Sequence, residues 1–432
     1  MLITIIIFVV ILSLLVFVHE AGHFWTARRF GMRVEEFGFG LPPRIFGWRF
    51  YRENKIEKLT ETEKISLEVK EEQRADGSVA TEEIITDKTR EIDLLTPIKK
   101  RSWVWGRGDE KENSVGTIYS LNWIPIGGFV KIKGENGEAK EEKDSFASKS
   151  IWKRAIVLAS GVTMNILLCV AILSVGFGIG LPAAIDGIPK GAVVSDRSLQ
   201  IIQVLPNTGA EAAGLKAGDV ILGANGNNFT THDSLRGFLS DKSGQTIDLK
   251  IKRNGAEEIR QVKVGEFENT VGLGVALAEV GIVRYPWHLA FWEGIKATWF
   301  WLVMIFSAVG LLIKNLFVHA PVPLEIAGPV GIAVLTGQAA KMGFIYVMQF
   351  TALLSLNLAI INILPFPALD GGRILFLIIE KLRGRAIKQQ WENLAHNIGF
   401  ILLMVLVVLV TYRDLAKYGG RILGALGKVV GL

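Results

Sequence analysis

The sequence has 432 residues, half of them hydrophobic, a formal net charge of +6 and a mean hydropathy of +0.36. This hydropathy excludes an ordinary soluble globular chain and indicates a membrane protein that contacts the lipid bilayer. No nucleic-acid partner is expected, because the basic residues cluster beside apolar runs, where a chain meets anionic headgroups. The single cysteine, Cys169, excludes an intrachain disulfide framework and a cysteine-based metal site.

The first segment, 1–50, begins with an apolar run that ends in His19-Glu20-Ala21-Gly22-His23. On a helix, histidines four residues apart lie one turn apart on one face and can share a metal ion, with Glu20 placed to take a proton from a water on that ion. The alternative is a pair of interfacial histidines, but ionisable groups in lipid are costly unless they line a polar cavity. The run lacks a positive n-region and a cleavage site, so we expect it to be retained as the first span.

Basic residues flank the loop between the first span and the second span, 149–182. The positive-inside rule therefore places this loop in the cytoplasm. Its charged part, 51–115, has short alternating patches that predict short strands or hairpins in a soluble insert. Two interpretations are open for this insert: a solvated, partly disordered appendage, or a specific docking element.

The apolar part of the same loop, 116–148, is too short to span a membrane. It has Pro125 near its centre, followed by Gly127, Gly128 and Phe129. This pattern predicts a β-hairpin that dips into the membrane from the cytoplasmic side. Non-helical backbone at that depth needs protein or water around it, so we expect the hairpin to pack beside a cavity.

A change of character follows the second span, at residues 186–280. Glycine, aspartate, asparagine and alternating β-branched residues predict a compact β-rich domain with one helix near 231–240. The Gly214-Leu215-Lys216-Ala217-Gly218-Asp219 turn resembles that of a PDZ domain. PDZ grooves accept an extended peptide by strand addition. Two roles are open for this domain: it binds a peptide, or it excludes bulky ectodomains by size.

The remaining segments are 287–342, a third span within 343–390, a fourth span at 396–412 and a tail at 413–432. The β-rich domain lies outside, whereas basic residues place the end of the third span inside. Because one crossing is needed between them, we expect 287–342 to lie along the outer interface or to re-enter. The fold class is therefore a polytopic α-helical membrane protein with four spans, a membrane-dipping β-hairpin and an inserted extracytoplasmic PDZ-like domain.

The third span ends near Asp370, on the same side as the histidines, so Asp370 is the proposed third metal ligand. Two imidazoles and a carboxylate leave a fourth tetrahedral position for water, as a catalytic zinc requires. Pro365 and Pro367 interrupt the helix before it, and Asn357 and Asn362 are candidates to hydrogen-bond an unwound substrate backbone. An ordinary helix stop with polar caps is the alternative for that motif, and a helix–helix hydrogen bond is the alternative for Asn165.

Together, the H-E-x-x-H motif, the Gly-Gly-Phe-Val hairpin, the PDZ-like insert and Asn362-x-x-Pro365-x-Pro367-x-Leu369-Asp370-Gly371 resemble the site-2 protease family of intramembrane zinc metalloproteases, in a version similar to the bacterial RseP type with a single PDZ domain. The resemblance implies one zinc ion held by His19, His23 and Asp370, with Glu20 as the catalytic acid and base. It also implies a substrate-contacting Asn362 and an edge strand offered by the hairpin. Two departures are Gly161-Val162, where the family has Gly-Pro, and the long insert at 51–115.

The implied function is cleavage of single-span membrane proteins within their transmembrane segments, with an anti-sigma factor or a signal-peptide remnant as substrate. The implied location is the bacterial cytoplasmic membrane, with the active site towards the cytoplasm and a peptide or ectodomain at the extracytoplasmic PDZ domain. Two alternatives are a membrane zinc peptidase of quality control and a non-catalytic PDZ membrane adaptor. The intact Glu20 argues against the adaptor, and the Leu-Asp-Gly context argues against the other peptidase.

Overall fold

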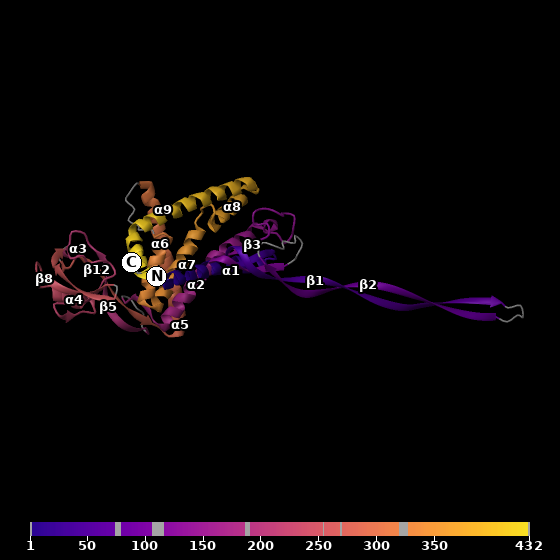
Figure 1. The fold of residues 1–432 in the computed structure, drawn as a ribbon, viewed down its shortest axis with the longest axis horizontal. Helices are drawn as coiled ribbons and strands as arrows, with labels where there is room; N and C mark the ends of the chain where they lie inside the picture. The colour runs from indigo at the N-terminus through magenta and orange to yellow at the C-terminus, as the bar shows by residue number, and fades with distance from the viewer. Residues whose placement is uncertain are drawn as a thin grey trace.

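The computed structural model describes residues 2–73, 79–105, 116–185, 191–253, 255–267, 270–318 and 327–430. Helices fill the middle of the molecule, a compact β-rich unit lies at one end, and a long two-stranded ribbon extends from the other end (Figure 1). The predictions made for 106–115, 186–190, 319–326 and 431–432 lie outside the described residues.

The helical part is organised around α2, which packs against α1, α5, α7 and α8. Its sequence is apolar along most of its length, and Cys169, Leu173 and Leu356 are fully buried where α2 meets α7. The helices of this part are α1 (Leu2–Arg29), α2 (Ile151–Ile179), α5 (Trp287–Val318), α6 (Pro329–Met342), α7 (Phe344–Ile363), α8 (Asp370–Arg383) and α9 (Gln389–Val430), and the short 3-10 helix η1 (Phe146–Ser148) precedes α2.

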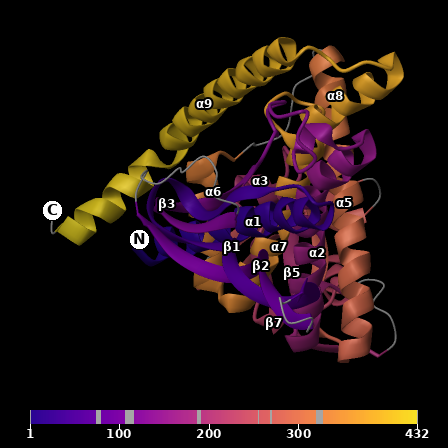
Figure 2. The same cartoon turned by 90° about the vertical axis from the view of Figure 1, so that its right-hand side faces the viewer.

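Within the described residues, five helices are long and apolar enough to cross a membrane, namely α1, α2, α5, α7 and α9. The sequence predicts four spans, because it excludes 287–318 from crossing. In Figures 1 and 2, α5 runs across the long axis of the molecule, whereas α1 runs along that axis. The count of four spans stays a prediction. α9 continues without interruption through the predicted tail as far as Val430.

A sheet of order β2-β1-β3 lies beside α1 and consists of β1 (Val34–Gln73), β2 (Val79–Trp105) and β3 (Gly116–Ile132). β3 turns at Gly127, where φ is +77°. Glu36 of β1 pairs with both Ile118 and Lys131 of β3. The two arms of the predicted hairpin therefore flank β1 and do not pair with each other. The turn is visible in the sequence, but the strand that separates the arms comes from a segment some eighty residues earlier.

Beyond this sheet, β1 and β2 continue as one antiparallel ribbon that ends at the pair Gln73 and Val79. The ribbon projects away from the helices (Figure 1). The prediction of short strands in the insert is wrong in length. No glycine or proline occurs between Asn54 and Gln73 to end the strand, so alternating residues continue the pairing.

The β-rich unit has its own core, in which Leu199, Leu235 and Leu249 are almost fully buried. Its main sheet has the order β4-β12-β5-β6-β8-β9, with β7 paired to β6, and β10 pairs with β11 separately. Helix α4 confirms the predicted helix near 231–240, and the Thr231 side chain caps it by accepting from the backbone N–H of Ser234. The elements are β4 (Leu181–Ala184), β5 (Val193–Val204), α3 (Gly209–Ala212), β6 (Val220–Ala224), β7 (Asn227–Asn228), α4 (His232–Leu239), β8 (Thr246–Arg253), β9 (Ala256–Lys263), β10 (Gly265–Phe267), β11 (Thr270–Gly272) and β12 (Val275–Arg284).

Candidate metal centre

Two histidines of α1 form the first half of the site. His19 and His23 follow each other by one helical turn, and each is only 6% exposed. Their Nε2 atoms lie 3.2 Å apart, and their rings meet edge to face with centroids 4.9 Å apart. The spacing read from the sequence therefore places both imidazoles in one buried position.

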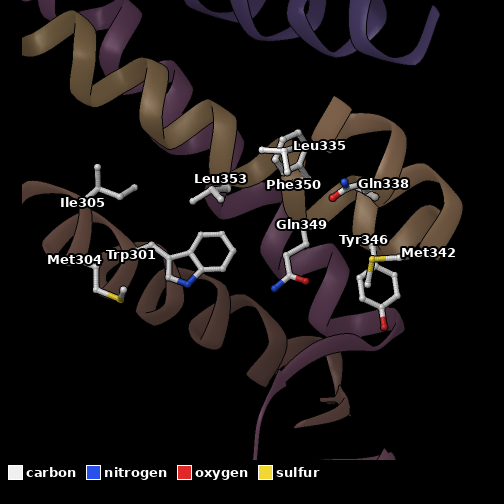
Figure 3. Close-up of a pocket in the computed structure, with 11 residues that line it drawn as sticks. Trp301, Met304, Ile305, Leu335, Gln338, Met342, Tyr346, Gln349, Phe350 and Leu353 are labelled. Carbon is white, nitrogen blue, oxygen red and sulfur yellow. The ribbon is translucent and has the colours of Figure 1, made fainter. Parts of the chain in front are cut away.

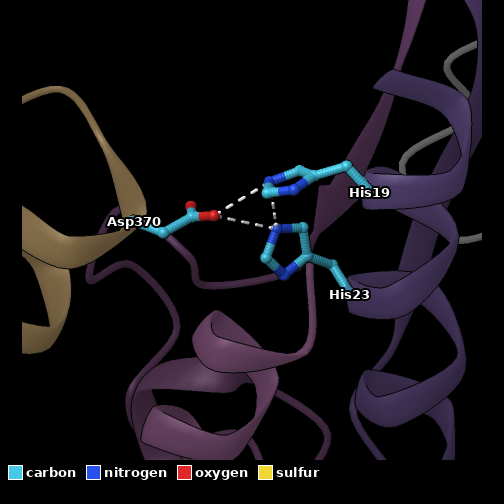
Figure 4. Close-up of side chains that lie close together, drawn as sticks. All are labelled: His19, His23 and Asp370. Carbon is cyan, nitrogen blue, oxygen red and sulfur yellow. Dashed lines mark hydrogen bonds and ion pairs between the residues drawn. The ribbon is translucent and has the colours of Figure 1, made fainter. Parts of the chain in front are cut away.

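The second half is Asp370, the first residue of α8. Its Oδ2 atom lies 2.9 Å from Nε2 of His19 and 3.3 Å from Nε2 of His23 (Figure 4). A tight turn from α7 brings it there, since a Cβ atom at Gly371 would lie 2.2 Å from the carbonyl oxygen of Leu364. Glycine is needed directly after Asp370 because any side chain would collide with the end of α7.

These three side chains fit a zinc ion. Their ligand atoms all lie within 4.8 Å of one another. Zn–N and Zn–O bonds of about 2.0–2.1 Å place tetrahedral ligand atoms roughly 3.3 Å apart. The three separations, 2.9, 3.2 and 3.3 Å, are close to that value. Three protein ligands leave a fourth position open, which distinguishes a catalytic zinc from a structural one.

The other ring nitrogens are held by α2. Nδ1 of His23 lies 2.7 Å from the carbonyl oxygen of Val157, so it carries the proton and leaves Nε2 free for a metal. Nδ1 of His19 lies 3.4 Å from Nδ2 of Asn165, which is fully buried and whose Oδ1 has no hydrogen-bond partner among the described residues. A flip of the Asn165 amide, which exchanges Oδ1 and Nδ2, lets Oδ1 accept the Nδ1 proton of His19 and removes the unpaired atom.

Sequence reasoning missed two of these contacts. The backbone carbonyl of Val157 carries no side-chain signal. Gly161 belongs to the segment that departs from the family pattern, and it faces both imidazoles so closely that no side chain fits there. The small pair Ser160-Gly161 within an apolar span was the available signal, since small residues allow helices to approach closely in membranes.

The predicted base, Glu20, lies within electrostatic range of His19, His23 and Asp370. The predicted glycines pack against the same helix, one turn before the histidines. A Cβ atom at Gly127 would lie 3.0 Å from Val16, and one at Gly128 would lie 3.6 Å from Phe17. The Ser13 hydroxyl, one further turn back, donates to the carbonyl of Pro125 at 2.7 Å. The turn of β3 is therefore fastened to α1 beside the site.

The remaining predicted residues are less closely engaged. Phe129 packs against the backbone of Gly38, where a Cβ atom would lie 2.4 Å from its ring. Asn357 and Asn362 are half-buried on α7 and are not part of the metal cluster. α7 joins the site indirectly, because the Ser355 hydroxyl donates to the carbonyl of Asn165 at 2.8 Å.

Ion pairs brace α8 on the side towards η1. Arg154 of α2 pairs with Glu380 at 2.6 Å, and Arg373 of α8 pairs with Glu135. Their side chains help to line a cavity of ≈ 170 Å³ between α2, α8 and the start of α9. α8, and with it Asp370, is thus attached to α2 by charge as well as by packing.

An apolar pocket of ≈ 440 Å³ lies elsewhere, between α5, α6 and α7 (Figure 3). Trp301, Leu335 and Phe350 are among the residues that line it, and none of the three metal-cluster residues takes part. Gln349 of the same lining donates to the carbonyl of Pro182 at 3.3 Å. The pocket is therefore at the end of α7 beside β4, whereas Asp370 follows the opposite end.

Two imidazoles and a carboxylate gathered among apolar helices define a candidate metal centre in a membrane protein. The model of peptidase family M50 matches residues 7–57 and 109–406. The chain belongs to this family, the site-2 proteases, and is a zinc metalloprotease. The resemblance drawn from the motifs and the expectation of zinc are thereby confirmed.

Relatives from bacteria support this assignment over nearly the whole length. The zinc metalloprotease RasP of Oceanobacillus iheyensis is 31% identical, with 96% of this chain and 99% of the relative covered. The regulator of sigma-W protease RasP of Bacillus subtilis is 29% identical, with 96% and 98% covered. The apolar helices and these bacterial relatives indicate an inner-membrane protein.

A PDZ domain of the SdrC-like protein from Listeria monocytogenes is 24% identical, covers 20% of this chain and 92% of its own, and has a TM-score of 0.19. The PDZ assignment of the β-rich unit stays a prediction.

Proposed function

We propose that this chain is an intramembrane zinc endopeptidase that cuts single-span membrane proteins within their transmembrane segments. The observation that carries the proposal is the meeting of His19, His23 and Asp370, which come from opposite ends of the sequence, inside a layer of apolar helices. A soluble peptidase has no need to bury such a centre among helices of this hydropathy, since charged groups in that setting are costly.

In this proposal the two imidazoles and the Asp370 carboxylate hold the zinc. When bound there, zinc supplies a Lewis acid that polarises the scissile carbonyl and makes a water nucleophilic near neutral pH. Glu20 takes the proton of the attacking water and passes it to the leaving amine nitrogen. The Val157 carbonyl and Asn165 keep the imidazole protons on the Nδ1 atoms, so that both Nε2 atoms face Asp370.

The same geometry supports a role in substrate positioning for the turn of β3. Gly127 and Gly128 of β3 pack against α1 about one turn before His19. An extended substrate segment beside them can pair with the backbone groups of this turn. A helical peptide bond is shielded from attack, so cleavage requires such local unwinding. Asn357 and Asn362 are proposed to hydrogen-bond the unwound backbone from α7.

The proposed orientation has the zinc site towards the cytoplasm and the β-rich unit outside. It is supported by the course of α7, whose Gln349 contacts β4 of the β-rich unit and whose other end leads to Asp370. Arg28 and Arg29, at the end of α1 after the histidines, give the same orientation by the positive-inside rule.

The substrate class is proposed from the relatives. One relative is named a regulator of sigma-W protease, so an anti-sigma factor is the first candidate for this chain, with a signal-peptide remnant as the second. The β-rich unit is proposed to act as a PDZ domain that binds a peptide or excludes untrimmed ectodomains.

The decisive test is a Glu20→Gln variant in vesicles that contain a single-span reporter. We expect zinc content to stay at the wild-type level, because Glu20 is not a ligand, and reporter cleavage to fall by at least about a hundredfold, the lower range for loss of general acid–base catalysis. Glu257→Gln, at an exposed surface pair, is the matched control and should cleave normally. Cleavage by Glu20→Gln at the wild-type rate would refute the mechanism.

A further inference from the structure

A group of aromatic side chains lies outside both the metal centre and the helix packing. The aromatic shelf, as we name it, consists of Phe46, Trp48, Phe50, Trp103 and Trp105 at the base of the ribbon. The exposed fractions of Trp48, Phe50, Trp103 and Trp105 are 37%, 52%, 58% and 66%. Exposed aromatic residues gathered in one patch mark an interaction surface more often than a solvated one.

The shelf occupies one face of the sheet. Phe46 pairs with Trp105 and Trp48 pairs with Trp103 across the β1–β2 ladder, with ring centroids 5.9 Å and 6.2 Å apart. Residues directly opposite in a ladder point to the same side of the sheet. On the other side, Val104 is only 3% exposed. The sheet therefore shows one covered face and one open aromatic face.

The open face continues the surface on which α1 packs. Trp48 pairs with Tyr119 across the β1–β3 ladder, and the Tyr119 ring lies 5.9 Å from the Phe24 ring of α1. The Tyr119 hydroxyl accepts a hydrogen bond of 3.1 Å from Nη1 of Arg28. The shelf consequently lies beside α1, at the level where this apolar helix changes to arginine.

Charge follows the aromatic residues along the ribbon. The register pairs Phe50 with Arg101, Tyr51 with Lys100 and Arg52 with Lys99. Aromatic residues followed by basic residues is the order that a chain has on leaving a bilayer, because tryptophan and tyrosine prefer the headgroup level and lysine and arginine attract anionic phosphates.

We propose that the aromatic shelf is a membrane anchor that inserts into the phospholipid headgroup region beside the C-terminal end of α1. The occupant is lipid, because the shelf continues the side of α1, a helix long and apolar enough to span the bilayer, and because basic residues follow it in the register of the ribbon. The anchor holds the base of the ribbon at the surface of the bilayer and directs the charged ribbon into the solvent. This function goes beyond the proposed proteolysis and does not depend on it.

The test uses full-length protein with Cys169→Ala, so that one new cysteine can carry an environment-sensitive fluorophore. Trp103→Cys and Trp105→Cys place the label on the shelf, and Asp241→Cys, exposed on the β-rich unit, is the control. The proteins are reconstituted in phosphatidylcholine vesicles, without substrate, with nitroxide lipids that quench at shallow or deep positions. We expect a blue-shifted emission and shallow quenching at least about threefold stronger at 103 and 105 than at 241.

A second measurement guards against damage by the cysteine itself. Trp48→Asp, added to the labelled Trp105→Cys protein, should abolish most of the shallow quenching, whereas Val193→Asp, at an exposed site on β5, should leave it unchanged. Adding phosphatidylglycerol should strengthen the quenching in a salt-dependent manner. Water-like emission without quenching at both shelf positions would overturn the proposal. Quenching that appears only after a substrate helix is added would also overturn it, by making the shelf a substrate surface.

Discussion

Gly161 of α2 faces His23 of α1 so closely that a Cβ atom at Gly161 would lie 2.5 Å from Nε2 of His23. The same Cβ atom would lie 2.7 Å from Nε2 of His19. Both distances are shorter than any normal carbon–nitrogen contact. The absence of a side chain at this one position therefore decides whether the two imidazoles can point at Asp370.

Gly161→Ala should for this reason displace the imidazoles and weaken zinc binding by at least roughly tenfold, in the range found when groups that orient metal ligands are altered. Zinc affinity measured by competition with a chelator tests this. Gly310→Ala is the control, because a Cβ atom there meets no atom within 4 Å. Normal zinc affinity in Gly161→Ala would show that α2 can retreat without cost.

Asn165→Leu removes the acceptor that we assign to Nδ1–H of His19. We expect about a 10–100-fold loss of zinc affinity, because the imidazole loses the partner that fixes its tautomer. Asn165→Asp keeps an acceptor oxygen and should lie closer to the wild type. Thr163→Ala, on the exposed side of α2, is the control and should leave the zinc affinity unchanged. If Asn165→Leu and Asn165→Asp bind zinc equally well, Asn165 serves only to join the helices.

Glu380→Gln tests the ion pair that joins α2 to α8. The Arg154–Glu380 pair is only 15% and 18% exposed, so its loss should lower the free energy of unfolding by about 1.5–3 kcal/mol, the range for hydrogen bonds to charged groups. Zinc affinity should fall with it, since Asp370 begins α8. The charge swap Arg154→Glu with Glu380→Arg should restore part of both quantities in a double-mutant cycle. If the effects of the Arg154 and Glu380 substitutions on stability are additive, the two side chains do not form a direct pair.

The β-rich unit carries a pH-dependent contribution to stability at Asp219, which is 1% exposed. Burial by itself raises the pKa of Asp219, but hydrogen bonds from Arg253 and from the backbone of Lys216 lower it below its ordinary value. The folded-state pKa is therefore lower than the unfolded-state value of about 3.9, and the stabilisation is present above that pH and lost as the pH falls through the folded-state value.

Arg253→Ala should destabilise this unit by about 3–5 kcal/mol near neutral pH, because it leaves a buried carboxylate without its partner. Hydrogen exchange of β6 and β8 in the full-length protein measures the effect. Lys250→Ala is the matched control, since its pair with Glu257 is 47% and 56% exposed and contributes roughly 0–1 kcal/mol. Equal exchange rates in the two variants would contradict the assigned role of Asp219.

The local features of this protein followed from the order of its residues. The four-residue spacing of His19 and His23 required a shared helix face, and an uncharged run before them required a membrane helix. A helix near 231–240 was predicted and corresponds to α4, and the turn at Gly127 could be recognised by its residue types. Each of these depends on neighbours within a few positions, where helix and strand periods govern which side chains share a face.

The long-range features depended on packing. The sequence suggested that Asp370 joins the histidines, but only the fold brought its Oδ2 atom within 2.9 Å of His19 across 351 positions. The insertion of β1 between the two arms of β3 had no local signal. The small pair Ser160-Gly161 indicates a close helix contact, but it does not show that the imidazoles are the partners. Pairing between distant segments is chosen by the fit of whole surfaces, and periodicity within one segment does not specify which partner covers it.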